Sequence, residues 1–205
     1  MIKIFLDACV LVPISLTNVI RTAAEHDLVQ PYWPSTVVEE AVLAIAEMRP
    51  GLGEDRIRRR FTAMNSAFPG ASVTAGTSTL DDYYFPDPDD KHVAAAAMAA
   101  GAQTVVTANT KDFPKPLIHR LGLSVMTPDD LLLALLEDDT EAMTSVVVEI
   151  TEALNNPART KDDILVSLRL AGAPRFATKV RGLLKLDGLL LDTDERFVVR
   201  NTHHG

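Results

Sequence analysis

Four carboxylates stand where they could do chemistry together. Asp7 ends the first apolar run, Glu40 lies early in an expected helix, and Asp90 precedes an alanine-rich run. Asp112 follows the apolar residues 104–106. Carboxylates that converge without Lys or Arg partners repel one another, and a hard cation such as Mg²⁺ or Mn²⁺ is the usual compensation. With a phosphodiester substrate, such ions lower the pKa of a water and neutralise charge on the phosphate. If the four meet, they predict metal-dependent phosphodiester hydrolysis.

Each of these acidic residues also has an ordinary structural explanation. An Asp after a strand is often a turn or cap residue, and Glu39 beside Glu40 could be the inward carboxylate instead. The run at 87–90 could complement a helix macrodipole, and the residues at 109–112 could form an Asx turn. His92 falls close to the same run, but positions two apart on a helix do not face each other, which favours a structural role. Only the combination of residues distinguishes the two explanations.

Strands alternating with helices must position these side chains. Residues 2–6 predict a buried parallel strand that ends at Asp7. Further strand candidates lie at 71–74, 104–107 and 124–127, and helices are expected over 54–68, over the alanine-rich segment to 100 and over 131–136. A helix capped by Ser35 is expected after a Pro-rich bridge at 31–34. The alternation predicts an α/β domain with a mainly parallel sheet over residues 1–137. Ligands of such sheets bind at the carboxyl ends of the strands.

Residues 138–205 predict an all-helical C-terminal extension, with helices at 140–155, 161–171 and 174–186. Three basic residues of the last helix, Arg175, Lys179 and Arg181, are candidates for RNA binding, and Phe176 could stack a base there. An equally good interpretation is a surface that binds a partner or packs on the first domain.

Charge and composition limit the classes of function. The 205 residues carry a net charge of −8, which argues against non-specific attraction to nucleic acid. The charge is uneven, because residues 1–150 hold 11 basic and 21 acidic residues and the rest hold nine and seven. The acidic part therefore needs metal or a basic partner before it binds phosphate. Cys9, the only cysteine, excludes an internal disulfide. No apolar run is long enough for a membrane span, and the acidic turn at Asp7 predicts no export signal, so a cytoplasmic setting is expected.

Four blocks of sequence, in a fixed order, carry more information than any single residue. They are a strand with an Asp at 5–11, a Ser-initiated helix with an inward Glu at 35–42, an Asp with an Ala-rich helix at 90–97, and a strand with a Thr-x-Asn tip and a following Asp-Phe at 105–113. Together they resemble the PIN-domain ribonucleases. The Asp-Pro-Asp-Asp-Lys-His and Asn-Thr-Lys-Asp-Phe-Pro segments look most like bacterial VapC-type toxins that carry a helical C-terminal extension.

The resemblance implies a fold and a ligand set. The fold would be a PIN-like three-layer α/β/α domain with a mainly parallel central sheet, followed by the helical extension. The catalytic and metal-binding residues, with Mg²⁺ or Mn²⁺, would be Asp7, Glu40, Asp90 and Asp112. Asn109 would be an auxiliary polar ligand, and Asp87 an additional contributor through water. The family usually has Asn or Ser two residues after the first Asp; Cys9 stands there in this chain, which puts in doubt the hydrogen bond that such a residue gives the site.

The resemblance also implies a function. The protein would be an endoribonuclease that cuts a structured RNA, tRNA or rRNA, as the toxin of a toxin–antitoxin pair. A cognate antitoxin would neutralise it by inserting its C-terminal segment, with an Arg replacing metal charge, and the toxin would form a homodimer. The alternative is a non-catalytic PIN-like module that binds RNA or protein. A third possibility keeps the nuclease chemistry but acts in RNA processing or on DNA.

Overall fold

A five-stranded parallel sheet forms the centre of the protein. The computed structural model describes residues 1–73, 80, 83–87, 90–154 and 157–186. Positions 88 and 89 of the Asp-Pro-Asp-Asp-Lys-His segment, and the end of the extension from residue 187, lie outside these described residues. The strands are β1 (Ile2–Leu6), β2 (Val29–Pro34), β3 (Ser72–Val73), β4 (Thr104–Val106) and β5 (Ser124–Met126), in the order β3-β2-β1-β4-β5. Every neighbouring pair is parallel, as predicted.

Strand β2 differs from the sequence prediction, because it covers residues 31–34, for which the sequence predicts a Pro-rich bridge and no strand. Proline has no N–H to donate to a sheet. Trp33 donates its N–H to Ala71 beside β3, at 2.9 Å. Residues two apart in a strand point their N–H groups the same way, so the N of Pro31 faces the β3 side as well. β3 pairs only with Trp33 and Pro34, and Pro31 therefore interrupts no ladder.

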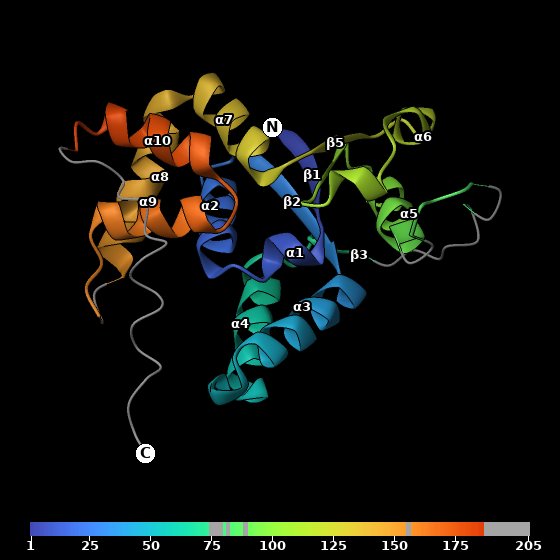
Figure 1. Cartoon of the computed structure of the whole chain (residues 1–205), viewed down its shortest axis with the longest axis horizontal. Helices are drawn as coiled ribbons and strands as arrows, with labels where there is room; N and C mark the ends of the chain where they lie inside the picture. The colour runs from blue at the N-terminus through green and yellow to red at the C-terminus, as the bar shows by residue number, and fades with distance from the viewer. Residues whose placement is uncertain (74–79, 81–82, 88–89, 155–156, 187–205) are drawn as a thin grey trace, which may run out of the picture.

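Ten α-helices and two short 3₁₀ helices lie among the described residues. Those of the first part are α1 (Ala8–Leu11), α2 (Ile14–Glu25), α3 (Ser35–Met48), η1 (Pro50–Leu52), α4 (Glu54–Ala67), α5 (Lys91–Ala99), η4 (Thr110–Asp112) and α6 (Lys115–Arg120). Ser35 is the first residue of α3 and Pro34 its N-cap, one position earlier than predicted. Right-handed crossovers put α1–α4 on one face of the sheet and α5 and α6 on the other. Figure 1 shows these two groups on opposite sides of the strands.

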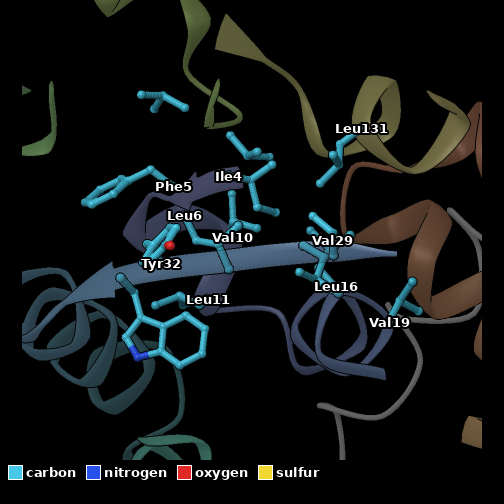
Figure 2. Close-up of a cluster of buried hydrophobic side chains, with 14 of the residues drawn as sticks. Ile4, Phe5, Leu6, Val10, Leu11, Leu16, Val19, Val29, Tyr32 and Leu131 are labelled. Carbon is cyan, nitrogen blue, oxygen red and sulfur yellow. The ribbon is translucent and has the colours of Figure 1, made fainter. Parts of the chain in front are cut away.

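The hydrophobic core is continuous from the sheet into the helices. Ile4, Phe5 and Leu6 of β1 are fully buried, as expected for a central parallel strand covered on both faces. In Figure 2, Ile4 lies towards Leu131 of a later helix, and Val29 of β2 lies beside Leu16 of α2. One buried cluster therefore joins the sheet to the C-terminal helices.

The C-terminal helices are α7 (Pro128–Asp138), α8 (Thr140–Ala153), α9 (Lys161–Leu170) and α10 (Pro174–Leu183), which confirms the expected all-helical extension. α8 and α9 pack on α2, and α10 packs on α7 and α9. Figure 1 shows the group gathered around α2, at the end of the molecule away from α5 and α6. Because α7 packs mainly with α8 and α10, it lies with the extension, although the sequence placed it in the first domain. The boundary at residue 137 stays a prediction.

Candidate active site

The carboxyl ends of β1 and β4 meet at the centre of the sheet. Asp7 follows β1 directly and Thr107 follows β4, and the backbone N of Asp7 donates to Val106 O at 3.1 Å. The chain leaves β1 towards β2 and later returns to its other side as β4. This is the topological switch point, where ligands of open parallel sheets bind.

The carboxylate of Asp7 is held by three donors. Its Oδ1 accepts the N–H of Ala8 at 2.7 Å, as the N-cap of α1. Its Oδ2 accepts the hydroxyl of Thr107 at 2.6 Å and the thiol of Cys9 at 3.2 Å. Thr107 is fully buried, so its rotamer is set by packing. These bonds fix one carboxylate at the switch point in a single orientation.

Cys9 supplies the hydrogen bond that the sequence had put in doubt. Burial, followed by the charge of Asp7, raises the pKa of the thiol to about 11. The thiol therefore stays protonated at neutral pH and donates to Asp7. Its sulfur also accepts the N–H of Ala108 at 3.2 Å. Cys9 thus gives Asp7 the hydrogen bond expected from Asn or Ser at this position.

The pKa of Asp90 is raised by burial and by the nearby carboxylates. Burial is the main cause that raises its pKa to about 6, and the charges of Asp7, Asp87 and Asp112 raise it further, while His92 lowers it. Charges act in this way only over short distances. Four acidic residues from three separate segments are therefore close enough to influence one proton.

Glu40 reaches the same region through α5. Its Oε1 lies 3.2 Å from Nε2 of His92, in the first turn of that helix. Glu39 points elsewhere, because Arg58 binds both of its oxygens, at 2.7 and 2.9 Å. The same contact lowers the pKa of Glu39. Of the two adjacent glutamates, Glu40 is therefore the one that approaches α5, and His92 joins the site as its partner.

Asp112 and Asn109 are joined to each other. The amide Nδ2 of Asn109 donates to Oδ2 of Asp112 across the turn of η4. The backbone N–H of Asn109 donates to the Thr107 hydroxyl at 3.0 Å, so the turn is tied to the residue that holds Asp7. Thr107 was absent from the predicted set, although its position directly after a strand at this edge was a signal for it.

The donor chemistry of this group fits a hard divalent cation. Apart from His92, its charged side chains are carboxylates, the oxygen ligands that Mg²⁺ and Mn²⁺ prefer. Within the part of the chain that the structure describes, no three Asp, Glu, His or Cys side chains are already arranged around one point as ligands. Glu40 is turned to His92 and Asp112 to Asn109. The assignment of Asp7, Glu40, Asp90 and Asp112 as ligands, with Asn109 and Asp87 as auxiliaries, stays a prediction.

The three predicted RNA-binding residues lie on α10, and each contacts a carboxylate. Arg175 binds Asp129 at 2.8 Å and also Asp130. The other two pairs are Lys179 with Glu137 and Arg181 with Asp162, each at 2.9 Å. Phe176 is fully buried, so the idea that it stacks a base is wrong. Pairing offsets the positive charge of these residues, and their role in binding RNA stays a prediction.

Two family profiles and one curated protein match this chain. A sequence profile described as "PIN domain" matches residues 3–111, and one described as "VapC50 C-terminal domain" matches residues 128–182. The chain is also 35% identical over 94 residues to "Putative ribonuclease VapC50" of Mycobacterium tuberculosis (strain ATCC 25618 / H37Rv).

That similarity covers 46% of this chain and 55% of the relative, so the match spans about half the length of the curated protein. No solved structure matches. Among the described residues, no helix has both the length and the apolar character that a membrane crossing requires.

Proposed function

The chain belongs to the PIN-domain family, and on that premise we propose that it is a metal-dependent endoribonuclease of the VapC type. The observation that carries the proposal is the gathering of Asp7, Asp87, Asp90 and Asp112 at the switch point, where burial and then the three other charges raise the pKa of Asp90. Like charges gathered at the switch point of a parallel sheet destabilise the folded chain unless a bound cation offsets their repulsion. The similarity to a putative ribonuclease, and the family of the domain, favour a phosphodiester as the substrate.

The proposed ligands of Mg²⁺ or Mn²⁺ are Asp7, Glu40, Asp90 and Asp112. A bound divalent ion would lower the pKa of a water and neutralise charge that develops on the phosphate. Asn109 and Asp87 are proposed as auxiliary polar groups. The intact acidic set favours the enzyme over the non-catalytic module.

The protein's own residues would orient this set. Thr107 and Cys9 hold Asp7, so that one ligand needs no reorganisation. Asp90 must lose its proton before it can act as a ligand. His92 contacts Glu40 at the start of α5. Asn109 is hydrogen-bonded to Asp112 in the η4 turn. Only Asp7 is fixed in advance, whereas Glu40 and Asp112 would turn from His92 and Asn109 to reach a metal.

We propose a structured RNA, either tRNA or rRNA, as the substrate, and the cytoplasm as the place of action. A cognate antitoxin would neutralise the enzyme by placing a basic C-terminal segment in the acidic region, where an Arg would replace the charge of the metal. The enzyme is proposed to act as a homodimer. Of the candidate RNA contacts on α10, Arg175 has the most exposed side chain, at 61%, and would be the first to test.

The test is cleavage of total RNA by the purified full chain, free of antitoxin, with Mg²⁺, with Mn²⁺ and with EDTA. Asp7→Asn and Asp90→Asn are compared with Asp55→Asn, which makes the same charge change at an exposed position on α4. We expect discrete products that require metal, vanish in the first two variants and persist in the third. Separate reactions with tRNA, rRNA and an unstructured RNA then test the substrate class.

Calorimetric titration with each metal decides between enzyme and binding module. A folded protein that neither cuts RNA nor binds metal would disprove the catalytic proposal and favour the module. Cleavage that survives in both Asp7→Asn and Asp90→Asn would disprove the ligand set alone.

A further inference from the structure

An open groove lies between the loop before α5 and the start of α6. It has a volume of about 420 Å³ and is lined by Tyr83, Tyr84, Pro114, Pro116, Leu117 and Arg120. Two aromatic rings and two proline rings give it flat apolar surfaces. Tyr84 is 84% exposed and is the one aromatic residue among the large exposed hydrophobic residues that the structure describes. At this exposure the faces of the ring are accessible to a planar ligand.

Both sides of the groove are continuous with the candidate active site. Tyr84 lies three residues before Asp87, and Pro114 lies two residues after Asp112. Asp112 is hydrogen-bonded to Asn109, whose N–H donates to Thr107, the residue that holds Asp7, so the Pro114 side of the groove adjoins the candidate site. A chain bound at those carboxylates and continuing towards α6 would enter the groove.

The side of the groove formed by the α6 region carries a charge opposite to that of the candidate active site. Residues 113–127 contain no Asp or Glu, while Lys115 and Arg120 of α6 are exposed. The guanidinium carbon of Arg120 lies 5.6 Å from the centre of the Tyr83 ring, a cation–π distance. A phosphate repelled by the carboxylates would therefore meet cationic side chains at this side of the groove.

We infer that the groove is a subsite for one unpaired nucleobase of the RNA substrate, stacked on Tyr84, with the adjacent phosphate at Arg120. The inference rests on the proposed function, since it gives that nuclease a place for a base beside the scissile bond. Single-stranded bases stack on aromatic rings and on guanidinium planes. A flat, mostly apolar groove with one basic end provides both surfaces.

The experiment uses the full chain with Asp7→Asn, so that RNA is bound without being cut. The probe is a short single-stranded RNA that carries one 2-aminopurine, whose fluorescence falls on stacking. Adding Tyr84→Ala should raise the Kd about tenfold and abolish the quenching, because stacking on an aromatic ring contributes strongly to such binding. Tyr84→Phe keeps the ring and should retain both. Met48→Ala removes another exposed apolar side chain, at the end of α3, and should change neither.

Arg120→Ala tests the phosphate contact. We expect it to reduce the slope of log Kd against log salt by about one, whereas Arg59→Ala, at an exposed position on α4, should not change it. Equal Kd and quenching for the Tyr84→Ala variant and its parent would overturn the subsite, and so would a parent that binds no RNA. Cleavage by the protein with Asp7 intact, measured in parallel, separates the two proposals. Stacking without cleavage refutes the nuclease alone, and cleavage without a Tyr84 effect refutes the subsite alone.

Discussion

At the scale of single residues, the environment of Asp7 departs most from expectation. A cysteine two residues after a catalytic Asp looks like a loss, because a thiol is a weaker donor than a hydroxyl or an amide. Here burial keeps the thiol protonated, with a pKa of about 11. Its sulfur also accepts from a backbone N–H across the β1–β4 junction. The residue type differs from the family's usual choice, but the hydrogen bond is present.

Changing Cys9 tests this role directly. Cys9→Ala removes a donor to a proposed ligand, and loss of such a partner should weaken Mg²⁺ binding about tenfold. Cys9→Ser restores a donor, and we expect most of the affinity to return. Calorimetric titration measures both, with circular dichroism to show that the variants fold. Unchanged metal affinity in Cys9→Ala would show that Thr107 and the N–H of Ala8 hold Asp7 without the thiol.

Asp90 gives a pH-dependent prediction. Its pKa is raised from 3.8 to about 6 in the folded protein, so the folded state binds more protons than the unfolded state between these values. Stability therefore falls as pH rises through this window, and the loss persists above it. Asp90→Asn should stabilise the metal-free protein at pH 7 by roughly 1 kcal/mol, after allowance for solvent screening of a partly exposed group.

The measurement is urea unfolding in EDTA at pH 4 and pH 7. The variant and the native protein should nearly coincide at pH 4, where Asp90 is largely protonated in the folded state. A variant that is less stable than the native protein at pH 7 would contradict the repulsion that we infer among the carboxylates.

At the scale of elements, the turn between α1 and α2 depends on a residue from α4. Arg60 donates to Leu11 O at 2.7 Å and to the Thr17 hydroxyl at 2.6 Å. Burial lowers its pKa to about 10. Arg60 belongs to a helix rich in arginine, where a solvated guanidinium would be the ordinary arrangement. The structure instead uses it to satisfy the C-terminal carbonyl of α1 and so to fix the short helix that Asp7 caps.

Removing Arg60 should therefore cost stability. Arg60→Ala leaves partly buried acceptors without their donor, and we expect a loss of about 2 kcal/mol. Arg59→Ala, at the exposed neighbouring position, should stay within about 0.5 kcal/mol of the native protein. Chemical denaturation of both variants measures the difference. Equal losses would mean that Arg60 does not support the turn.

At the scale of the whole molecule, Asp129 of α7, the helix that follows the sheet, joins this helix to α10. It is 5% exposed, and its carboxylate accepts the backbone N–H groups of Arg175 at 3.2 Å and Phe176 at 2.9 Å. These amides belong to the first turn of α10, whose own N-cap, Ala173, has no side chain that can serve. A residue of α7 thus caps α10 from a distance.

Asp129→Ala should loosen the extension more than the sheet. The variant removes the acceptor of two N–H groups in the first turn of α10, and loss of such a helix cap costs about 1 kcal/mol. Hydrogen exchange should therefore become faster in α10, while β1 stays protected. Asp138→Ala, at an exposed position of the same helix, is the control. Unchanged protection of α10 would show that apolar packing alone holds it.

Local patterns in the sequence determined much of this protein. The apolar run ending in Asp7, the alanine-rich segment and the C-terminal helices all appear where periodicity and caps predicted them, because these signals act over a few residues. The parallel α/β class followed from their alternation. β2 was missed because proline is a local signal against strands, whereas the neighbouring strand is too short to need the missing N–H.

Only the tertiary structure decided what each polar side chain contacts. Asp7 meets Thr107 across 100 positions of sequence, and Glu40, not Glu39, turns to α5 because Arg58 occupies its neighbour. The basic residues of α10 form ion pairs with carboxylates, and Phe176 is buried in the core. Such outcomes depend on distances between segments remote along the chain. Residue types and local spacing leave these distances open, and folding fixes them.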